Sequence, residues 1–279
     1  MNTPATAHAH HPAGSRKPLL RHRKNVELLR PPQLAALQQA FARVIEISQN
    51  QVTDNRGFQH FAGIHGMPQW LCQHGDAPGS NPLFLPWHRA YLYAFELSLR
   101  DQVSDAALVW WDWTSPASHA SGIPAAFAAP EAEGKPNPLF KAPVQPAARQ
   151  NDQPTETFRR PRSPGELPTA ERIRQIVSLR SFADFTTQIE DVHNRVHGWA
   201  GGTMGIVAWA AYDPIFWAHH TNIDRLWRTW QLRHPQNFPP SFLNRALPPF
   251  PLTVAQTLNM KSLGYDYASS SAHVAGTNA

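Results

Sequence analysis

The sequence contains a single cysteine, Cys72, in 279 residues, which excludes a disulfide bond within the chain. No apolar run approaches the roughly 20 residues that a membrane-spanning helix needs, so we expect no membrane partner. The N-terminus lacks the basic-then-apolar order of a secretory signal peptide. We therefore expect a cytoplasmic protein.

Charge is also scarce, because charged residues make up only 16% of the chain, and no internal repeat is evident. The net charge of +5 includes two short basic runs, at residues 21–24 and 159–162. Neither run is interleaved with aromatic residues on a recognisable binding module, as nucleic-acid recognition would require. We interpret both as solvated basic faces and expect no nucleic-acid partner.

Proline, tryptophan and histidine are well represented, with 27, 10 and 15 residues respectively. Hydrophobic residues form 42% of the chain, which is ample for a large core. The combination favours a helical core that carries long ordered loops. We predict a single domain over residues 1–279, with flexible tails at 1–20 and 268–279.

Two histidines, His193 and His197, stand four residues apart in a segment with helical apolar spacing. On a helix they lie on one face, one turn apart, so both can reach one metal ion. Ser181 is the expected N-cap of this helix and Gly198 its expected stop. Glu190 belongs to the same polar stripe.

A second helix is predicted from Asp213, an N-cap residue that a proline follows, to the region of residue 234. His220 falls on the face of this helix that carries bulky apolar residues, whereas His219 lies nearer a flank. We take His220 as the third ligand and His219 as a neighbour of the ligands. Asp224 is expected to form a structural ion pair with Arg225 or another arginine.

The other half of the chain offers a second triplet: His65, His74 and His88. Pro86 is the expected start of a helix to about Gln102, on which His88 faces inward. Three inward-facing histidines in each half indicate metal binding, because burying unpaired polar groups is costly. Nitrogen ligands without a carboxylate favour copper or zinc over magnesium, calcium or manganese.

Three segments resemble a known family: FLPWHRAYLYAFE at 84–96, HNRVHGWAGGTM at 193–204 and DPIFWAHHTNID at 213–224. They are similar to the copper-binding signatures of tyrosinases, catechol oxidases and molluscan hemocyanins. Together with WWDWT at 110–114 and GYDY at 264–267, the resemblance covers nearly the whole chain. It implies a mainly α fold, in which an antiparallel four-helix bundle with long Pro-rich loops houses a binuclear type-3 copper site. We expect a short, bacterial-like form without a C-terminal extension.

The resemblance implies two copper ions held by six histidines: His65, His74 and His88 for one, and His193, His197 and His220 for the other. The thirteen residues between His74 and His88 are a longer spacer than many members have, so His60 is the nearest alternative to His74. Cys72 precedes His74 by two residues, as in relatives that form a Cys–His thioether bond. The alternative is a free, buried cysteine.

With O2 as co-substrate, the resemblance implies oxidation of phenols to o-quinones. Glu190 and Asn194 resemble a pair proposed to hold the water that accepts the phenol proton; the alternative for Glu190 is an ion pair with Arg195 or a loop arginine. Val207 matches a position where tyrosinases carry a small residue, and Gly198 is smaller still. With Arg195, which could steer substituted phenols, they are our candidates for substrate access.

We therefore predict a tyrosinase that acts on small phenols and serves melanin biosynthesis. The alternatives are a catechol oxidase with diphenolase activity only, a hemocyanin-like oxygen-binding protein, and a zinc hydrolase, which six histidines in two triplets fit poorly. The natural phenol and the oligomeric state stay open, and a separate copper-loading partner is compatible with the sequence.

Overall fold

A computed structural model of the chain describes residues 20–75 and 82–268. The predicted tails lie outside these residues except for Leu20 and Ala268. The fold is mainly α, as predicted. Its helices are α1 (Pro31–Asn50), α2 (Phe58–His65), α3 (Phe84–Gln102), α4 (Pro116–Ser121), α5 (Ala125–Ala128), α6 (Ala170–Ser178), α7 (Phe182–Ala200), α8 (Val207–Ala210), α9 (Pro214–Arg233), α10 (Pro240–Leu243) and α11 (Val254–Thr257). Short 3-10 helices are η1 (Val26–Leu28), η2 (Pro146–Ala148), η3 (Pro164–Glu166) and η4 (Gly202–Gly205).

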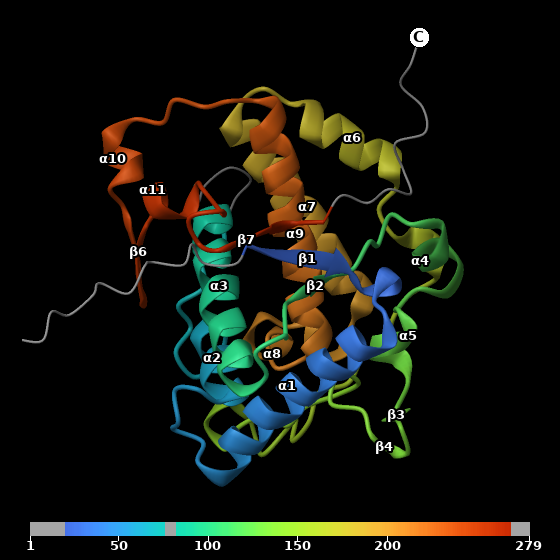
Figure 1. Cartoon of the computed structure of the whole chain (residues 1–279). Coiled ribbons are helices and arrows are strands. Elements are labelled where there is room, and N and C mark those ends of the chain that lie inside the picture. The colour runs from blue at the N-terminus through green and yellow to red at the C-terminus, as the bar shows by residue number, and fades with distance from the viewer. Residues whose placement is uncertain (1–19, 76–81, 269–279) are drawn as a thin grey trace, which may run out of the picture.

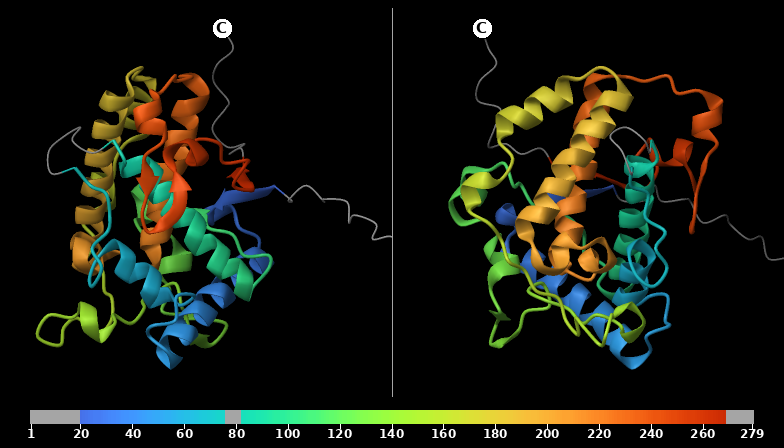
Figure 2. Two further views of the ribbon diagram at one scale, coloured as in Figure 1. Left: turned by 90° about the vertical axis from the view of Figure 1, so that its left-hand side faces the viewer. Right: turned by 180° about the vertical axis from the view of Figure 1, so that it is seen from behind.

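The long helices form the body of the molecule. Helix α3 packs on α1, α7 and α9, and α7 packs on α9. Figure 1 shows α3 and α9 side by side with α1 crossing below them, and the rear view in Figure 2 shows α7 against α9. All candidate ligands except His74, which lies in a loop, therefore come from helices of this body: α2, α3, α7 and α9. Their antiparallel order as a four-helix bundle stays a prediction.

The helix ends differ from expectation at two places. Helix α3 begins at Phe84, not at Pro86, because a proline in the first turn removes an N–H group that has no helical partner there. Helix α7 passes through Gly198 and ends at Ala200. Its C-cap is Gly201, whose φ of 61° is readily adopted only by glycine.

Both ends of the described chain meet in one small sheet. Strand β1 (Arg21–Asn25) lies between β2 (Val109–Trp110) and β7 (Tyr265–Tyr267) and pairs with both in parallel. The segment after α9 contains α10 and the hairpin of β5 (Ala246–Leu247) and β6 (Phe250–Thr253). A further hairpin joins β3 (Glu131–Ala132) to β4 (Lys135–Pro136).

One hydrophobic core of buried residues extends from Val26 to Val254, and a small second cluster contains Met260, Leu263 and Tyr265. Tryptophans of the WWDWT segment, Trp111 and Trp113, are fully buried in the main core. Among the described residues, no helix is long and apolar enough to cross a membrane. The long helices and this core hold the histidines in the interior of the molecule.

Candidate metal centre

Three histidines of α7 and α9 point their Nε2 atoms at a common centre. The Nε2 atom of His193 lies 3.0 Å from that of His197 and 3.0 Å from that of His220, and the third side of the triangle measures 3.1 Å. Metal–imidazole bonds are about 2 Å long, so three nitrogens at this spacing can share one ion. The i, i+4 spacing on α7 therefore produces the predicted pair, and α9 adds the third nitrogen.

Hydrogen bonds at the other ring nitrogens support metal binding by this triangle. The Nδ1 atom of His197 donates to the carbonyl of Met204 at 2.8 Å. That of His193 lies 3.0 Å from Oδ1 of Asn194, where it can donate as well. A neutral imidazole with its proton on Nδ1 presents a lone pair at Nε2. Lone pairs facing one another at about 3 Å repel unless a cation lies between them, so the arrangement fits a metal ion.

The second triplet assembles around His65, the last residue of α2. Its Nε2 atom lies 3.3 Å from Nε2 of His74, which a loop supplies. His88 on α3 points its ring to within 5.5 Å of the His65 ring and 5.0 Å of the His74 ring, centroid to centroid. Its Nδ1 atom lies 2.8 Å from the carbonyl of Phe84, and its buried Nε2 atom has no hydrogen-bond partner among the described residues. Ligand atoms of His88 and His65 lie within 4.8 Å of each other. A buried imidazole nitrogen without a hydrogen-bond partner, so close to a second one, again fits a metal ligand.

The structure places His74, and not His60, beside His65. His60 is half-buried on α2, and its ring packs edge-on against Phe61. Burial lowers the pKa of His60, and the charge of Asp54 opposes that effect. His60 thus faces a different environment, so the alternative to His74 finds no support in the geometry.

The two triplets face each other. The ring of His88 stacks on that of His220 with centroids 4.7 Å apart, and His74 stacks on His193 at 5.4 Å. Ligand atoms of His65, His88 and His220 lie within 4.8 Å of one another, although they come from different triplets. Two ions bound here would be neighbours, which is the arrangement of a binuclear site.

Removal from water, reinforced by neighbouring histidines, holds the pKa of His65, His88, His193 and His220 well below the usual value. Burial also lowers the pKa of His197 to about 4, although its hydrogen bond to Met204 opposes the shift. Neutral imidazoles are the form that binds a metal, and they leave the charge of a bound cation uncompensated.

His219 lies beside the first triplet without being part of the triangle. Its ring stacks on that of His193 at 5.1 Å and is fully buried. Neither ring nitrogen has a hydrogen-bond partner among the described residues. Its ligand atom is within 4.8 Å of those of the triplet, but only the three triangle nitrogens approach to about 3 Å. This is the neighbouring position that we predicted.

A cavity of about 360 Å³ opens onto the histidines. Its walls are His65, His74, Gly75, His193, Asn194, His197, Gly198, Met204, Gly205, Val207 and Ala210. Two of our substrate-access candidates, Gly198 and Val207, thus line this cavity, and so does Asn194, our candidate for handling the phenol proton. Arg195 does not line this cavity; its guanidinium is exposed and pairs with Asp191 at 3.0 Å. Helical geometry explains the difference, since consecutive residues on α7 point in different directions.

Glu190 and Cys72 both approach His74. The buried carboxylate of Glu190 accepts a hydrogen bond from the Gly75 amide at 2.8 Å and lies 3.5 Å from Nδ1 of His74. The predicted alternative, an ion pair between Glu190 and Arg195, is not formed. The Cys72 sulfur lies within 4.8 Å of ligand nitrogens of His65 and His74, and burial raises its pKa to about 12.

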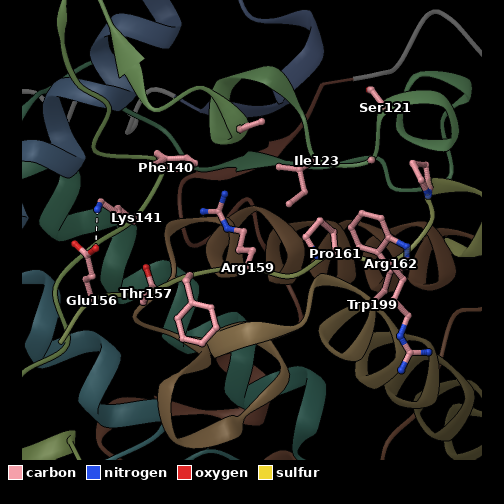
Figure 3. A pocket seen from close by; sticks show the side chains of 14 residues that line it. Ser121, Ile123, Phe140, Lys141, Glu156, Thr157, Arg159, Pro161, Arg162 and Trp199 are labelled. Atoms are coloured by element: carbon pink, nitrogen blue, oxygen red, sulfur yellow. Dashed lines mark hydrogen bonds and ion pairs between the residues drawn. The ribbon is translucent and has the colours of Figure 1, made fainter. Parts of the chain in front are cut away.

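A second, larger cavity of about 620 Å³ lies beyond the C-terminal end of α7 (Figure 3). Trp199 lines this cavity, whereas His197 and Gly198 line the other. Its Arg159 is bound to Asp213 and to backbone carbonyls, and no histidine lines its walls. The smaller cavity is therefore the candidate centre, because histidines line it, although the other cavity is larger.

Asp224 forms a buried ion cluster one turn beyond His220, but not with Arg225. Its carboxylate accepts hydrogen bonds from Arg89 and Arg23, and from the hydroxyl of Tyr267. Arg225 instead lies over the ring of Trp110 at 3.9 Å. The predicted structural ion pair of Asp224 is thus present. Its partners Arg89 and Arg23 are 135 and 201 residues away in the sequence, so no local sequence pattern identifies them.

Sequence reasoning set His220 among bulky apolar residues but did not identify which aromatic side chains contact the ligand rings. Phe216 stacks on His220 with centroids 3.9 Å apart, and Phe84 packs against His88 and His193. These aromatic residues read as ordinary core positions by their spacing. Their contacts restrict the ring orientations on which metal binding depends.

Comparison with known proteins agrees with this centre. The family model for the common central domain of tyrosinase matches residues 55–233, which include both triplets. A tyrosinase of Streptomyces antibioticus is 33% identical over 181 residues, covering 56% of this chain and 65% of the relative. Hemocyanin 1 of Megathura crenulata is 30% identical over 230 residues, covering 75% of this chain and 6% of the hemocyanin. The chain thus spans less than two thirds of the length of either relative.

The fold is shared as well. A tyrosinase from Burkholderia thailandensis superposes with a TM-score of 0.76 at 22% identity, over 90% of this chain and 74% of that one. At this identity the likeness concerns the fold alone.

Proposed function

Because the chain belongs to the tyrosinase family of type-3 copper proteins, we propose that it hydroxylates monophenols and oxidises o-diphenols to o-quinones with O2. The observation that carries the proposal is the pair of facing imidazole triplets beneath an accessible cavity. Small phenols are the proposed substrates. Their flat rings fit a cavity of about 360 Å³ whose floor is made of histidines.

Each triplet would hold one copper ion through neutral imidazoles. His65, His74 and His88 form one set, and His193, His197 and His220 form the other. When bound, the copper pair supplies O2 binding and the electron transfer that oxidises the phenol. The protein contributes ligands of fixed tautomer, since the Met204 and Phe84 carbonyls occupy the Nδ1 atoms of His197 and His88.

Glu190 and Asn194 are proposed to handle the phenol proton. A phenol has a pKa of about 10 and must lose its proton before it binds copper well. The Gly75 amide fixes the Glu190 carboxylate beside His74, and Asn194 both contacts His193 and lines the cavity. A water held by these two side chains would accept the proton.

Substitution of Glu190 tests this role. Glu190→Gln keeps the shape of the side chain but removes the base, so the kcat/KM for a monophenol should fall by roughly 10²-fold or more. Oxidation of the matching catechol should fall far less, because catechols lose their proton more readily. Asp191→Asn is the control, since Asp191 is exposed and pairs with Arg195. Equal losses for both substrates would refute the role of Glu190.

We further propose a thioether bond between Cys72 and His74. Bond formation removes one hydrogen from the sulfur and one from the imidazole carbon, with O2 at the copper pair as the oxidant. The product would anchor a ligand that a loop supplies. Intact-protein mass spectrometry should find the copper-treated protein two hydrogens lighter than the copper-free protein, whereas Cys72→Ser should show no such loss. An unchanged mass and a titratable thiol would refute the bond.

Two other functions are compatible with the same centre. The hemocyanin relatives favour an oxygen-binding protein, and a catechol oxidase would lack only the first reaction. Turnover of a monophenol and a catechol by copper-loaded protein separates them. Catechol turnover alone identifies a catechol oxidase, and O2 binding without turnover identifies an oxygen carrier. A copper-loading partner, a role in melanin biosynthesis and a cytoplasmic location stay predictions from the sequence.

A further inference from the structure

No charged side chain of the described residues lines the cavity over the histidines. Among the described residues, its lining consists of imidazoles, glycines, one amide and the apolar Met204, Val207 and Ala210. A substrate that enters therefore meets no described side chain of fixed charge.

The charged groups nearest in sequence are engaged elsewhere. Arg195, expected to steer substituted phenols, is bound to Asp191 and does not line the cavity. Glu190 is buried and accepts the Gly75 amide. The proposed role of Glu190 is at the phenol hydroxyl, so neither group is placed to pair with an ammonium or carboxylate at the other end of the substrate ring.

The entrance is apolar. Val207 lines the cavity and keeps 44% of its surface exposed. An apolar substituent can cover this exposed surface and gain from its removal from water. A charged substituent at the entrance, on the side of the ring away from the hydroxyl groups that approach the metal ions, would lose part of its hydration. It would find no counter-ion among the lining side chains, which is unfavourable for either sign of charge.

From these observations we propose that the site selects phenols and catechols whose para substituent is neutral and apolar, over those that carry an ammonium or a carboxylate. The inference rests on the proposed function and names its substrate class. Free tyrosine, which carries both charges, is on this basis a poor substrate.

Three catechols whose substituents begin with the same two-carbon chain test the proposal: 4-ethylcatechol is neutral, dopamine is cationic and 3-(3,4-dihydroxyphenyl)propionate is anionic. Because catechols are used, the result does not depend on hydroxylation. We expect copper-loaded protein to show a kcat/KM about tenfold higher for the neutral compound than for either charged one, a difference of about 1.4 kcal/mol. A charged compound that equals or exceeds the neutral one would overturn the proposal.

A gain of charge at the entrance should change this order. Val207→Arg should raise the kcat/KM ratio of the anionic to the neutral catechol by about fivefold, the upper range for an exposed ion pair. Val207→Arg should also lower the kcat/KM ratio of dopamine to the neutral catechol. Val207→Gln controls for size without charge, and Ile206→Arg controls for overall charge. Ile206 is the adjacent residue, is 45% exposed and does not line the cavity. If Ile206→Arg shifts the ratios as much as Val207→Arg, the cavity wall does not set the preference.

Binding without turnover separates this inference from the proposed function. Resorcinols with the same three substituents lack the ortho hydroxyl pair that quinone formation requires. Isothermal titration calorimetry with copper-loaded protein should show tightest binding for 4-ethylresorcinol. If this order holds while no catechol is oxidised, the proposed function fails and the selectivity stands. If catechols are oxidised but neither series prefers the neutral member, only the selectivity fails.

Discussion

His219 and His220 are adjacent on α9 and equally buried, yet their ring nitrogens meet different partners. His220 places Nε2 3.0 Å from that of His193, whereas His219 stacks its ring on the face of His193. A rotation of about 100° per residue separates the two side chains on a helix. At the scale of single residues, that rotation decides which histidine can share a metal with α7.

Matching substitutions at the two positions should therefore differ in copper content. His220→Leu should bind about one copper ion per chain after full reconstitution, because one triplet has lost its third nitrogen. His219→Leu should still bind two, since neither of its nitrogens has a described hydrogen-bond partner to lose. Metal analysis of both variants, with circular dichroism to verify folding, tests the assignment. Loss of one copper from His219→Leu alone would reverse it.

At the scale of secondary structure, the turn after α7 connects helix geometry to the metal centre. Gly201 and Gly202 have φ values of 61° and 56°, and η4 follows directly. The segment before α6 packs on this turn, because the amide of Thr203 donates to the carbonyl of Phe158 at 2.9 Å. The next residue, Met204, supplies the carbonyl that accepts from His197. The turn thus orients a candidate ligand.

Alanine at Gly202 should damage this turn. An added Cβ would collide with the carbonyl oxygen of Phe158, and the positive φ is unfavourable for alanine. We expect Gly202→Ala to lower the free energy of unfolding by about 1–3 kcal/mol and to speed loss of copper from the site that contains His197. Thermal unfolding and the rate of copper transfer to a chelator measure the two effects.

Gly198→Ala is the matched comparison. Gly198 lies inside α7, and an added Cβ there has no neighbouring heavy atom within 4 Å. Alanine is favoured over glycine in a helix by about 0.5–1 kcal/mol, so this variant should be slightly more stable than the wild type. If Gly202→Ala is as stable as the wild type, then the positive φ of Gly202 does not require glycine at this position.

At the scale of the whole molecule, the Asp224 cluster joins elements that are distant in the chain. Arg23 lies on β1, Arg89 on α3, and Tyr265 and Tyr267 on β7. Arg23 also pairs with Glu96 at 2.9 Å. The cluster is buried, so each charge depends on its partners to offset lost hydration. It therefore ties both ends of the described chain to the helices that carry His88 and His220.

Removing the central carboxylate should destabilise the protein strongly. Asp224→Asn removes the negative charge that pairs with Arg23 and Arg89. We expect the free energy of unfolding to fall by about 3–5 kcal/mol at pH 7. Asp266→Asn is the control, because Asp266 pairs with Arg228 at 3.4 Å in a partly exposed site and should cost about 1 kcal/mol at most. Urea denaturation of both variants measures the difference.

The destabilisation caused by Asp224→Asn should depend on pH and should be smaller in acid. Burial raises the pKa of Asp224, but Arg89, Arg23 and Tyr267 outweigh it and hold that pKa below its ordinary value. A carboxylate with a lowered folded pKa stabilises the protein above its unfolded pKa of about 3.9, and this contribution is lost as the pH falls further. The difference in free energy of unfolding between the wild type and Asp224→Asn should be constant from pH 5 to 7 and should become smaller below about pH 4. A gap that widens in acid would contradict this account.

Local pattern in the sequence was enough to predict part of this molecule. The positions of α7 and α9, the inward direction of His88 and the pairing of His193 with His197 follow from the helical period of 3.6 residues. A short stretch of the sequence is enough to recognise that period. The chemistry of six histidines without carboxylates in either triplet also follows from composition. The ends of the helices were predicted less well. Pro86 was expected to start a helix and Gly198 to stop one, but both residues lie inside their helices, because a helix tolerates proline in its first turn and glycine in its last.

Only the tertiary structure decided which elements meet. It placed His74, not His60, beside His65, gave Asp224 its partners Arg23 and Arg89, and turned Arg195 away from the cavity. Spacing along a helix determines which side chains share a face, but not which other segment packs against that face. That choice depends on burying the apolar surface of the whole chain at once, so the two triplets become one centre only in the folded core.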